Sequence, residues 1–362
     1  MTAIRINSNI SFDAGMSAGA QVLKILRKMK GMLIAAAVVL IIILGLWAYS
    51  GIWPPLVVIE SSSMQHSQTA SEIGVIDTGD LVIIKKVSGA EEVTTYLEGM
   101  KTGHQTYGEY GDVVIYKPYG QAQRTSIIHR AFARMIYNQS GGYDIPALKD
   151  IPQSSWSVSS GQKVWYNLNT QVSFFNIGYN QVTVKLNLTT ILNNFQGAHL
   201  APHSGIITLG DNNHGIVDQS PMANICWAPI KSEWVQGEAR GELPWFGLLK
   251  LWITGPSPDG PVPENSKTNL FISIGLIIAV PLAIDVTGYV LNRKGIDLWG
   301  GVRKKLGLKP RKSDEEGPAG SQPSAEKENM KEVKDADLKI KASGSGKAKN
   351  QPPVQKHKRK SK

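Results

Sequence analysis

The chain has 362 residues, a formal net charge of +10 and one cysteine. A single cysteine excludes an intramolecular disulfide, so any folded domain must be held together by its own core. The positive charge does not indicate a nucleic-acid-binding protein, because its excess lies at one end: from Arg293 onward, 20 Lys and Arg residues oppose 9 Asp and Glu. Residues 53–269 instead hold 14 basic and 18 acidic residues, so no specific nucleic-acid partner is expected.

The first predicted element is a transmembrane helix over residues 32–52, which follows a basic arm at residues 1–31. No charged residue occurs from Gly31 to Ile59, and a spanning helix needs about 20 mostly apolar residues. A cleaved signal peptide is the alternative, although its apolar core is usually about 7 to 15 residues long. We therefore expect this segment to be retained as an anchor.

Residues 53–254 are predicted to form a mainly β domain. Short apolar and β-branched runs alternate there with Gly-Asp and Gly-Gly turn signals, a pattern typical of strands joined by tight turns. Strands are expected at Leu56–Ile59, Leu81–Val87, Val113–Tyr116, Ser126–Phe132, Lys163–Leu168, Gln181–Leu188 and Gly205–Leu209. Residues 135–204 are polar and rich in Asn, Gln and Ser, which indicates a strand-rich insertion.

A Pro- and Gly-rich linker is expected at residues 255–269, followed by a second transmembrane helix at 270–291. Pro281 and Asp285 interrupt this second apolar run, so a buried helix of the domain is the alternative. Proline is tolerated in spanning helices, and we expect a span. Residues 292–362 are rich in Lys, Glu, Ser and Gly, which is typical of a disordered basic tail.

The charge distribution predicts how the chain crosses the membrane. Basic residues flank the first apolar run on its N-terminal side and the second on its C-terminal side. Because Lys and Arg near a span favour the cytoplasmic side, we expect a multi-pass protein of the cell membrane with both termini cytoplasmic and an extracytoplasmic middle. Membrane lipids are therefore expected partners, and the basic tail could contact anionic headgroups.

Two side chains in the middle region have the chemistry of nucleophilic catalysis. Ser63 lies in the run Ser61-Ser62-Ser63-Met64, directly after the first expected strand, and His129 lies in a later expected strand. A serine nucleophile needs a base that takes its proton, and histidine commonly serves. Spacing alone supports this pair weakly, because serine runs usually belong to ordinary loops.

Five boxes in a fixed order resemble those of type I signal peptidases. They are Ser61-x-Ser63-Met64, Gly79-Asp80-Leu81-Val82, Gly111-Asp112-Val113-Val114-Ile115-Tyr116, Ile128-His129-Arg130 and Gly210-Asp211-Asn212-Asn213 with Asp218. Bacterial members carry lysine where His129 stands, so the chain resembles the archaeal and endoplasmic-reticulum branch. The resemblance implies a signal-peptidase-like β catalytic domain, with a strand-rich insertion, flanked by N- and C-terminal transmembrane helices.

The resemblance also implies a role for each site residue. Ser63 is the nucleophile, His129 is its base, and the backbone N–H of Ser63 with the Ser61 hydroxyl forms the oxyanion hole. The later aspartate, Asp218, is expected to orient the base while Asp211 supports the site. Asp211 stays open as the alternative third member, because the loop between the two aspartates is slightly longer than usual.

The remaining histidines are not expected to take part. Many relatives have proline where this chain has His66, which lies too near Ser63 in the sequence to present its ring in line with the hydroxyl. His199 and His203 have a spacing that could suit a metal ion, but polar loop residues are the preferred interpretation. No metal ion or other cofactor is expected.

The expected activity is endoproteolysis of exported preproteins, with removal of their signal peptides. The substrate would bind extended against a strand edge, with small residues before the cut. The protein-translocation channel is a further candidate partner. Two alternatives stay open: a non-enzymatic membrane-anchored β-domain protein, such as an adhesin or translocon accessory protein, and a protease of the same mechanism that acts on other surface proteins.

Overall fold

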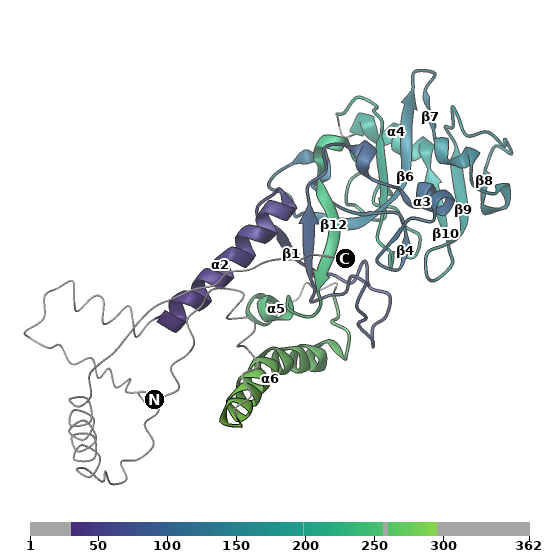
Figure 1. Cartoon of the computed structure of the whole chain (residues 1–362). Coiled ribbons are helices and arrows are strands. Elements are labelled where there is room, and N and C mark those ends of the chain that lie inside the picture. Colours follow the sequence, from purple (N-terminus) through teal and green to yellow (C-terminus); the bar gives the residue numbers. More distant parts are fainter. Residues whose placement is uncertain (1–29, 198, 256–259, 295–362) are drawn as a thin grey trace, which may run out of the picture. The chain divides into compact units, whose positions relative to one another are not determined.

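The computed structural model describes residues 30–197, 199–255 and 260–294 (Figure 1). Most of the predicted basic arm and of the predicted tail lies outside these residues. The chain divides into two compact units, Met1–Ala283 and Ile284–Lys362, and all packing described below lies within the first.

Two apolar helices flank the β domain along the sequence. Helix α2 spans Lys30–Ser50 and is followed by Gly51, whose φ of +71° is the left-handed conformation common after a helix. Helix α6 spans Ser266–Arg293. Among the described residues, Ser266–Leu291 is the one stretch long and apolar enough to cross a membrane by length and composition, and Ile34–Ser50 is a shorter apolar helix. Membrane insertion of either helix stays a prediction.

The chain between these helices is rich in antiparallel strands joined by short helices. The strands are β1 (Leu56–Val58), β2 (Leu81–Lys85), β3 (Gln105–Thr106), β4 (Glu109–Tyr110), β5 (Val113–Tyr116), β6 (Ile127–Asn138), β7 (Gly142–Asp144), β8 (Trp156–Val158), β9 (Gln171–Ile177), β10 (Val182–Asn187), β11 (Gly205–Leu209) and β12 (Val235–Leu243). The helices are α3 (Tyr96–Thr102), α4 (Leu188–Gly197) and α5 (Leu248–Thr254).

The largest sheet has the strand order β1-β2-β12-β5-β6-β11, and β7 pairs with the end of β6. Every pair in it is antiparallel. The expected strands at Val113–Tyr116 and Gly205–Leu209 have the predicted bounds. The strand expected to end at Phe132 instead runs on to Asn138. The predicted mainly β character of this region is therefore confirmed, and the structure shows that its sheets are antiparallel.

The strand expected at Lys163–Leu168 is wrong. Asn167 has a φ of +51°, which no regular strand adopts, and Leu168 forms only an isolated bridge to Tyr143. The ring of Trp165 packs under the Lys149 ammonium, 3.8 Å from the ring centroid. This segment is therefore an irregular loop whose apolar residues pack individually.

The insertion forms a second sheet of three strands, in the order β10-β9-β8 (Figure 1). Its apolar residues belong to the same buried cluster as the large sheet; Phe174 of β9, for example, packs edge-on against Phe132 of β6 with ring centroids 5.1 Å apart. Strand β6 also runs without a break through Met135, where the insertion was expected to begin. The insertion is thus part of one domain core.

A smaller buried cluster is formed by residues of β2, β5 and β12 and of the chain between β1 and β2. It contains Met64, which is 1 % exposed, together with Ile59, Val82, Ile115 and other apolar residues. Burial of an apolar side chain of this size stabilises a fold by roughly 1.5 to 3 kcal/mol. Met64 therefore anchors the loop that follows β1 to the core of the domain.

Candidate active site

Ser63 lies in the loop after β1, between the buried residues Ile59 and Met64. The strand pairing continues one residue past β1, because the Ile59 N–H donates to the Asp80 carbonyl oxygen at 3.0 Å. On the other side, the Gln65 N–H donates to the Ser62 carbonyl oxygen at 3.1 Å and closes a turn around Ser63. The Ser63 side chain is thus presented from a tight turn fixed at both ends.

His129 reaches Ser63 from β6, which is separated from β1 by three strands in the order of the large sheet. It lies in β6 opposite Val114 of β5, and only 4 % of the residue is exposed. The Ser63 Oγ atom lies 2.9 Å from Nε2 of the imidazole. Two residues that are 66 positions apart in sequence are therefore in hydrogen-bonding contact.

Asp218 lies on the opposite side of the imidazole and is fully buried. Its two carboxylate oxygens are 2.8 Å and 2.7 Å from Nδ1 of His129. The Tyr116 and Thr208 hydroxyls each donate to Oδ2 of Asp218 at 2.7 Å. Burial and the nearby Asp218 charge raise the pKa of Tyr116 well above its ordinary value, so Tyr116 remains a donor.

These contacts determine which imidazole nitrogen carries the proton. A carboxylate that accepts from two hydroxyls is an acceptor toward the imidazole as well, so Nδ1 of His129 carries a proton and donates it to Asp218. Nε2 is then left with a lone pair and accepts from the Ser63 hydroxyl. The arrangement can therefore take a proton from Ser63 and hold the resulting imidazolium against a buried carboxylate.

Ser61 lies beside the nucleophile candidate. Its hydroxyl oxygen is 3.3 Å from Oγ of Ser63, and both residues are half-buried. Within the described residues, the Ser63 N–H makes no hydrogen bond to another residue, whereas its carbonyl oxygen accepts from the Asn212 N–H at 2.8 Å. The Ser63 N–H is thus an available donor on the loop of residues 60–66, the candidate nucleophile loop. The Ser61 hydroxyl donates to Oγ of Ser63, because Ser63 gives its one proton to His129, and so lies close enough to serve as a second donor.

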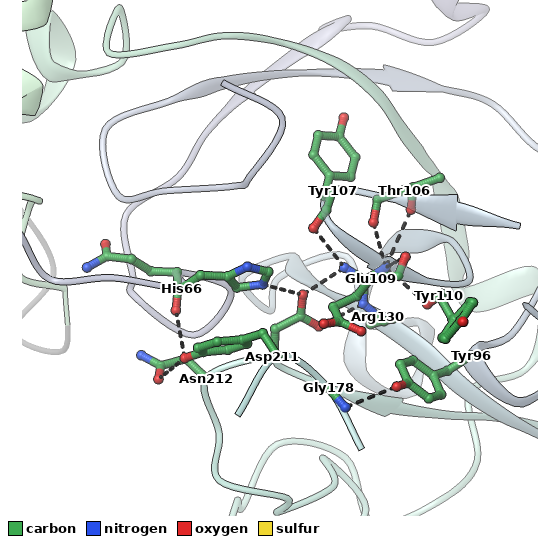
Figure 2. A network of polar contacts seen from close by, with 12 residues as sticks. His66, Tyr96, Thr106, Tyr107, Glu109, Tyr110, Arg130, Gly178, Asp211 and Asn212 are labelled. Carbon is green, nitrogen blue, oxygen red and sulfur yellow. Dashed lines mark hydrogen bonds and ion pairs between the residues drawn. The ribbon is translucent and has the colours of Figure 1, made fainter. Parts of the chain in front are cut away.

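Asp211 does not contact His129; it pairs with Arg130, as Figure 2 shows. Nε and Nη2 of Arg130 donate to the two Asp211 oxygens at 2.7 Å each, and Nε2 of His66 lies 3.1 Å from Oδ2. Burial alone would raise the pKa of Asp211, but the Arg130 charge and hydrogen bonds, with those of His66, hold this pKa below its ordinary value. Of the two aspartates, Asp218 is the one hydrogen-bonded to His129.

Sequence reasoning gave no role to four partners of these aspartates: Arg130, His66, Tyr116 and Thr208. His66 was expected to be uninvolved; it does not contact the Ser63 hydroxyl, yet it is hydrogen-bonded to Asp211 and stacked on Tyr179. Tyr116 was expected as the last residue of a strand and of one sequence box, and Thr208 was expected as a strand residue. Their positions, at the end of one box and just before another, carry no chemical signature that distinguishes them from ordinary sheet residues.

Other candidate groups are not assembled into a site. Within the described residues there is no cluster of three or more His, Cys, Asp or Glu that could hold a metal ion. His203 contacts the rings of Phe195 and Trp234. Burial raises the pKa of the Cys226 thiol to about 11, so this side chain is a packing residue and not a nucleophile at neutral pH.

No protein-family model, curated protein or solved structure matches this chain. The interpretation of the Ser63, His129 and Asp218 arrangement therefore depends on the sequence boxes and on the geometry described above.

Proposed function

We propose that this chain is a membrane-anchored serine endopeptidase of the type I signal peptidase kind, which removes signal peptides from exported preproteins. The observation that carries the proposal is the hydrogen-bonded line from Ser63 Oγ through the His129 imidazole to the Asp218 carboxylate. The order of the five sequence boxes supports the choice of substrate class.

In the proposed reaction, Oγ of Ser63 attacks the carbonyl carbon of the scissile peptide bond while its proton passes to Nε2 of His129. Collapse of the tetrahedral intermediate breaks the C–N bond, and His129 gives the proton to the departing amine. A water molecule then attacks the acyl ester with His129 again as base, which releases the signal peptide as an acid and restores Ser63. Asp218 holds the Nδ1 proton and stabilises each imidazolium state.

The negative oxygen of the tetrahedral intermediate needs fixed donors. We propose the Ser63 N–H and the Ser61 hydroxyl, whose oxygen is 3.3 Å from the nucleophile. Loss of one such donor commonly costs about 3 to 4 kcal/mol of transition-state stabilisation. The substitution Ser61→Ala should therefore lower kcat by about 100-fold or more without displacing His129.

The proposed location is the outer face of the cell membrane, with α2 and α6 as spans and both termini cytoplasmic. Ser63 follows the last residue of α2 by only thirteen positions, and a signal sequence presents its cleavage site just beyond its own apolar core. Strand β1, which leads into Ser63, is an edge strand of the large sheet. A tag at the C-terminus that is accessible from outside intact cells would overturn this topology.

The proposal is tested by cleavage of a labelled preprotein by the full chain in detergent. We expect wild type to cleave, and Ser63→Ala and His129→Ala to lose at least about 10³-fold in kcat. Matched controls are Ser140→Ala and His199→Ala, at exposed positions outside the site, which should cleave as wild type does. Undiminished cleavage by Ser63→Ala would contradict the proposal.

The same assay separates the alternatives. A non-enzymatic domain would cleave neither preproteins nor surface proteins, although such a domain would not need a buried His129 aligned between a serine and a carboxylate. A protease for other surface proteins would cleave those substrates in a Ser63-dependent way and leave preproteins intact.

A further inference from the structure

The insertion contacts the active-site loops through one tyrosine. Tyr179 lies in the turn between β9, the central strand of the insertion sheet, and the edge strand β10. Its hydroxyl lies 3.0 Å from Oδ1 of Asn212 and 3.4 Å from the carbonyl oxygen of Gln65. A side chain of the insertion therefore reaches both the nucleophile loop and the loop that begins with Asp211.

Asn212 connects this tyrosine to the nucleophile. Its Nδ2 donates to the Ser62 carbonyl oxygen at 3.0 Å, and its backbone N–H donates to the Ser63 carbonyl oxygen at 2.8 Å. Because the Tyr179 hydroxyl occupies Oδ1, the carboxamide is held with its amino group toward the nucleophile loop. Asn212 therefore holds the carbonyl groups of both Ser62 and Ser63, one before and one after the Ser63 Cα atom.

Stacking adds a second connection between the hairpin and the site. The Tyr179 ring lies parallel to the His66 ring, with centroids 4.1 Å apart and planes inclined by 19°. His66 in turn hydrogen-bonds Asp211, as Figure 2 shows. Aromatic pairs of this kind typically contribute about 0.5 to 1.5 kcal/mol beyond burial, so the stack is able to fix the position of His66.

The hairpin also contacts the middle of the loop that links the two aspartates. Gly215 is buried with a φ of +79°, and a side chain there would come within 2.6 Å of the Thr183 carbonyl oxygen of β10. The loop from Asp211 to Asp218 is therefore packed against the insertion at two points, Tyr179 and Thr183.

We propose that the insertion supports the active site and that Tyr179 is a positioning residue for Ser63, acting through the Asn212 carboxamide. This inference rests on the proposed serine protease function. It assigns to part of the 135–204 insertion a role in fixing the nucleophile, and not in recognising substrate.

The first experiment compares Tyr179→Phe, which removes only the hydroxyl, with Tyr166→Phe as a matched control. Tyr166 lies in the insertion too, is 51 % exposed and contacts the Trp165 ring. With a labelled preprotein and full-length chain in detergent, we expect Tyr179→Phe to lower kcat about 10-fold and change KM less than twofold. Tyr166→Phe should match wild type.

The relay through Asn212 is tested with Asn212→Ala and the double variant. If Tyr179 acts through this carboxamide, the double variant should be no slower than Asn212→Ala alone. Additive losses would overturn the relay. A change in KM with unchanged kcat in Tyr179→Phe would assign the hairpin to substrate binding and overturn the positioning role.

A second measurement does not depend on the substrate. In hydrogen-exchange mass spectrometry, Tyr179→Phe should speed exchange in peptides covering residues 60–66 and 210–214 at least threefold, with β9 and β10 unchanged. Unchanged exchange in those peptides would overturn the inference even if no cleavage assay succeeds. If wild type fails to cleave the preprotein while exchange responds as expected, the proposed removal of signal peptides fails and the structural support by Tyr179 stands.

Discussion

Two histidine–aspartate pairs lie beside each other in this molecule, and their aspartates are held in opposite ways. Asp218 meets His129 and two neutral hydroxyls, those of Tyr116 and Thr208. Asp211 meets His66 and the Arg130 guanidinium, which binds both of its oxygens. Successive strand residues point to opposite faces of a sheet. His129 therefore binds Asp218 on one face of β6, and its neighbour Arg130 binds Asp211 on the other.

The difference lies in charge compensation. No cation contacts Asp218 in the described part of the chain, so its charge is available to stabilise an imidazolium that forms on His129. The Asp211 charge is already compensated by Arg130. This ion pair therefore contributes little additional electrostatic stabilisation when a proton moves to a nearby group. We therefore propose that the Asp218 pair carries out proton transfer and that the Asp211 pair gives geometric support.

The largest effect is expected from Asp218→Asn. The amide keeps the shape of the side chain but offers His129 an uncharged partner and can favour the wrong imidazole tautomer. Loss of about 10³ to 10⁴-fold in kcat is expected, by analogy with the general behaviour of such triads. Single-turnover cleavage per folded molecule checks it, and a loss below tenfold would remove Asp218 from the reaction.

Asp211→Asn should act mainly on stability. It leaves the buried Arg130 guanidinium without its charge partner, which commonly costs about 3 to 5 kcal/mol in unfolding free energy. The matched control is Asp150→Asn, which breaks the exposed Lys101 pair and should cost less than about 1 kcal/mol. Urea unfolding measures both. If Asp211→Asn is as stable as wild type but inactive, the two roles are assigned the wrong way round.

The neutral donors around Asp218 give a smaller effect. Tyr116→Phe removes one hydrogen bond to a buried carboxylate, and such bonds contribute about 1.5 to 3 kcal/mol to stability. We expect that loss in urea unfolding, together with a fall in kcat much smaller than that of Asp218→Asn. Equal losses of kcat in the two variants would mean that the Tyr116 hydroxyl itself takes part in proton transfer.

Another buried carboxyl, Asp77, has one oxygen with no hydrogen-bond partner in the described part of the chain. Burial raises its pKa to about 6, although hydrogen bonds from Ser71 and Glu72 oppose the rise. Because the folded state holds this proton more tightly than the unfolded chain, the contribution to stability is present below about pH 4 and lost as the pH rises through about 6. Relative to wild type, Asp77→Asn should be more stable at pH 8 than at pH 5 by about 1 to 2 kcal/mol. Urea titrations at both values test this.

The sequence allowed much of the β domain to be predicted, for reasons visible in particular residues. Val113–Tyr116 is an uninterrupted β-branched and aromatic run, and the structure buries all four residues in the middle of the large sheet. Ser63 and His129 could be paired because nucleophilic chemistry requires these residue types and because both lie in boxes whose order resembles that of type I signal peptidases. The choice between Asp211 and Asp218 needed the structure, since both are aspartates in one loop.

Other features could not be read from the sequence. The residues at 163–168 have the composition of a strand, but packing of Trp165 and the backbone of Asn167 override that preference. The contact between Tyr179 and Asn212 joins residues 33 positions apart in separate elements. Such contacts depend on how the insertion sheet packs on the domain core, which local patterns do not encode.

The proposal that Ser63 is the nucleophile is tested most directly by identifying the atom that carries the acyl group. Full-length chain in excess over a labelled preprotein is quenched with acid within one turnover, digested and analysed by tandem mass spectrometry. We expect the signal-peptide fragment to be esterified to Ser63, with no adduct in Ser63→Ala. An adduct on another residue, or the same cleavage product from Ser63→Ala, would contradict it.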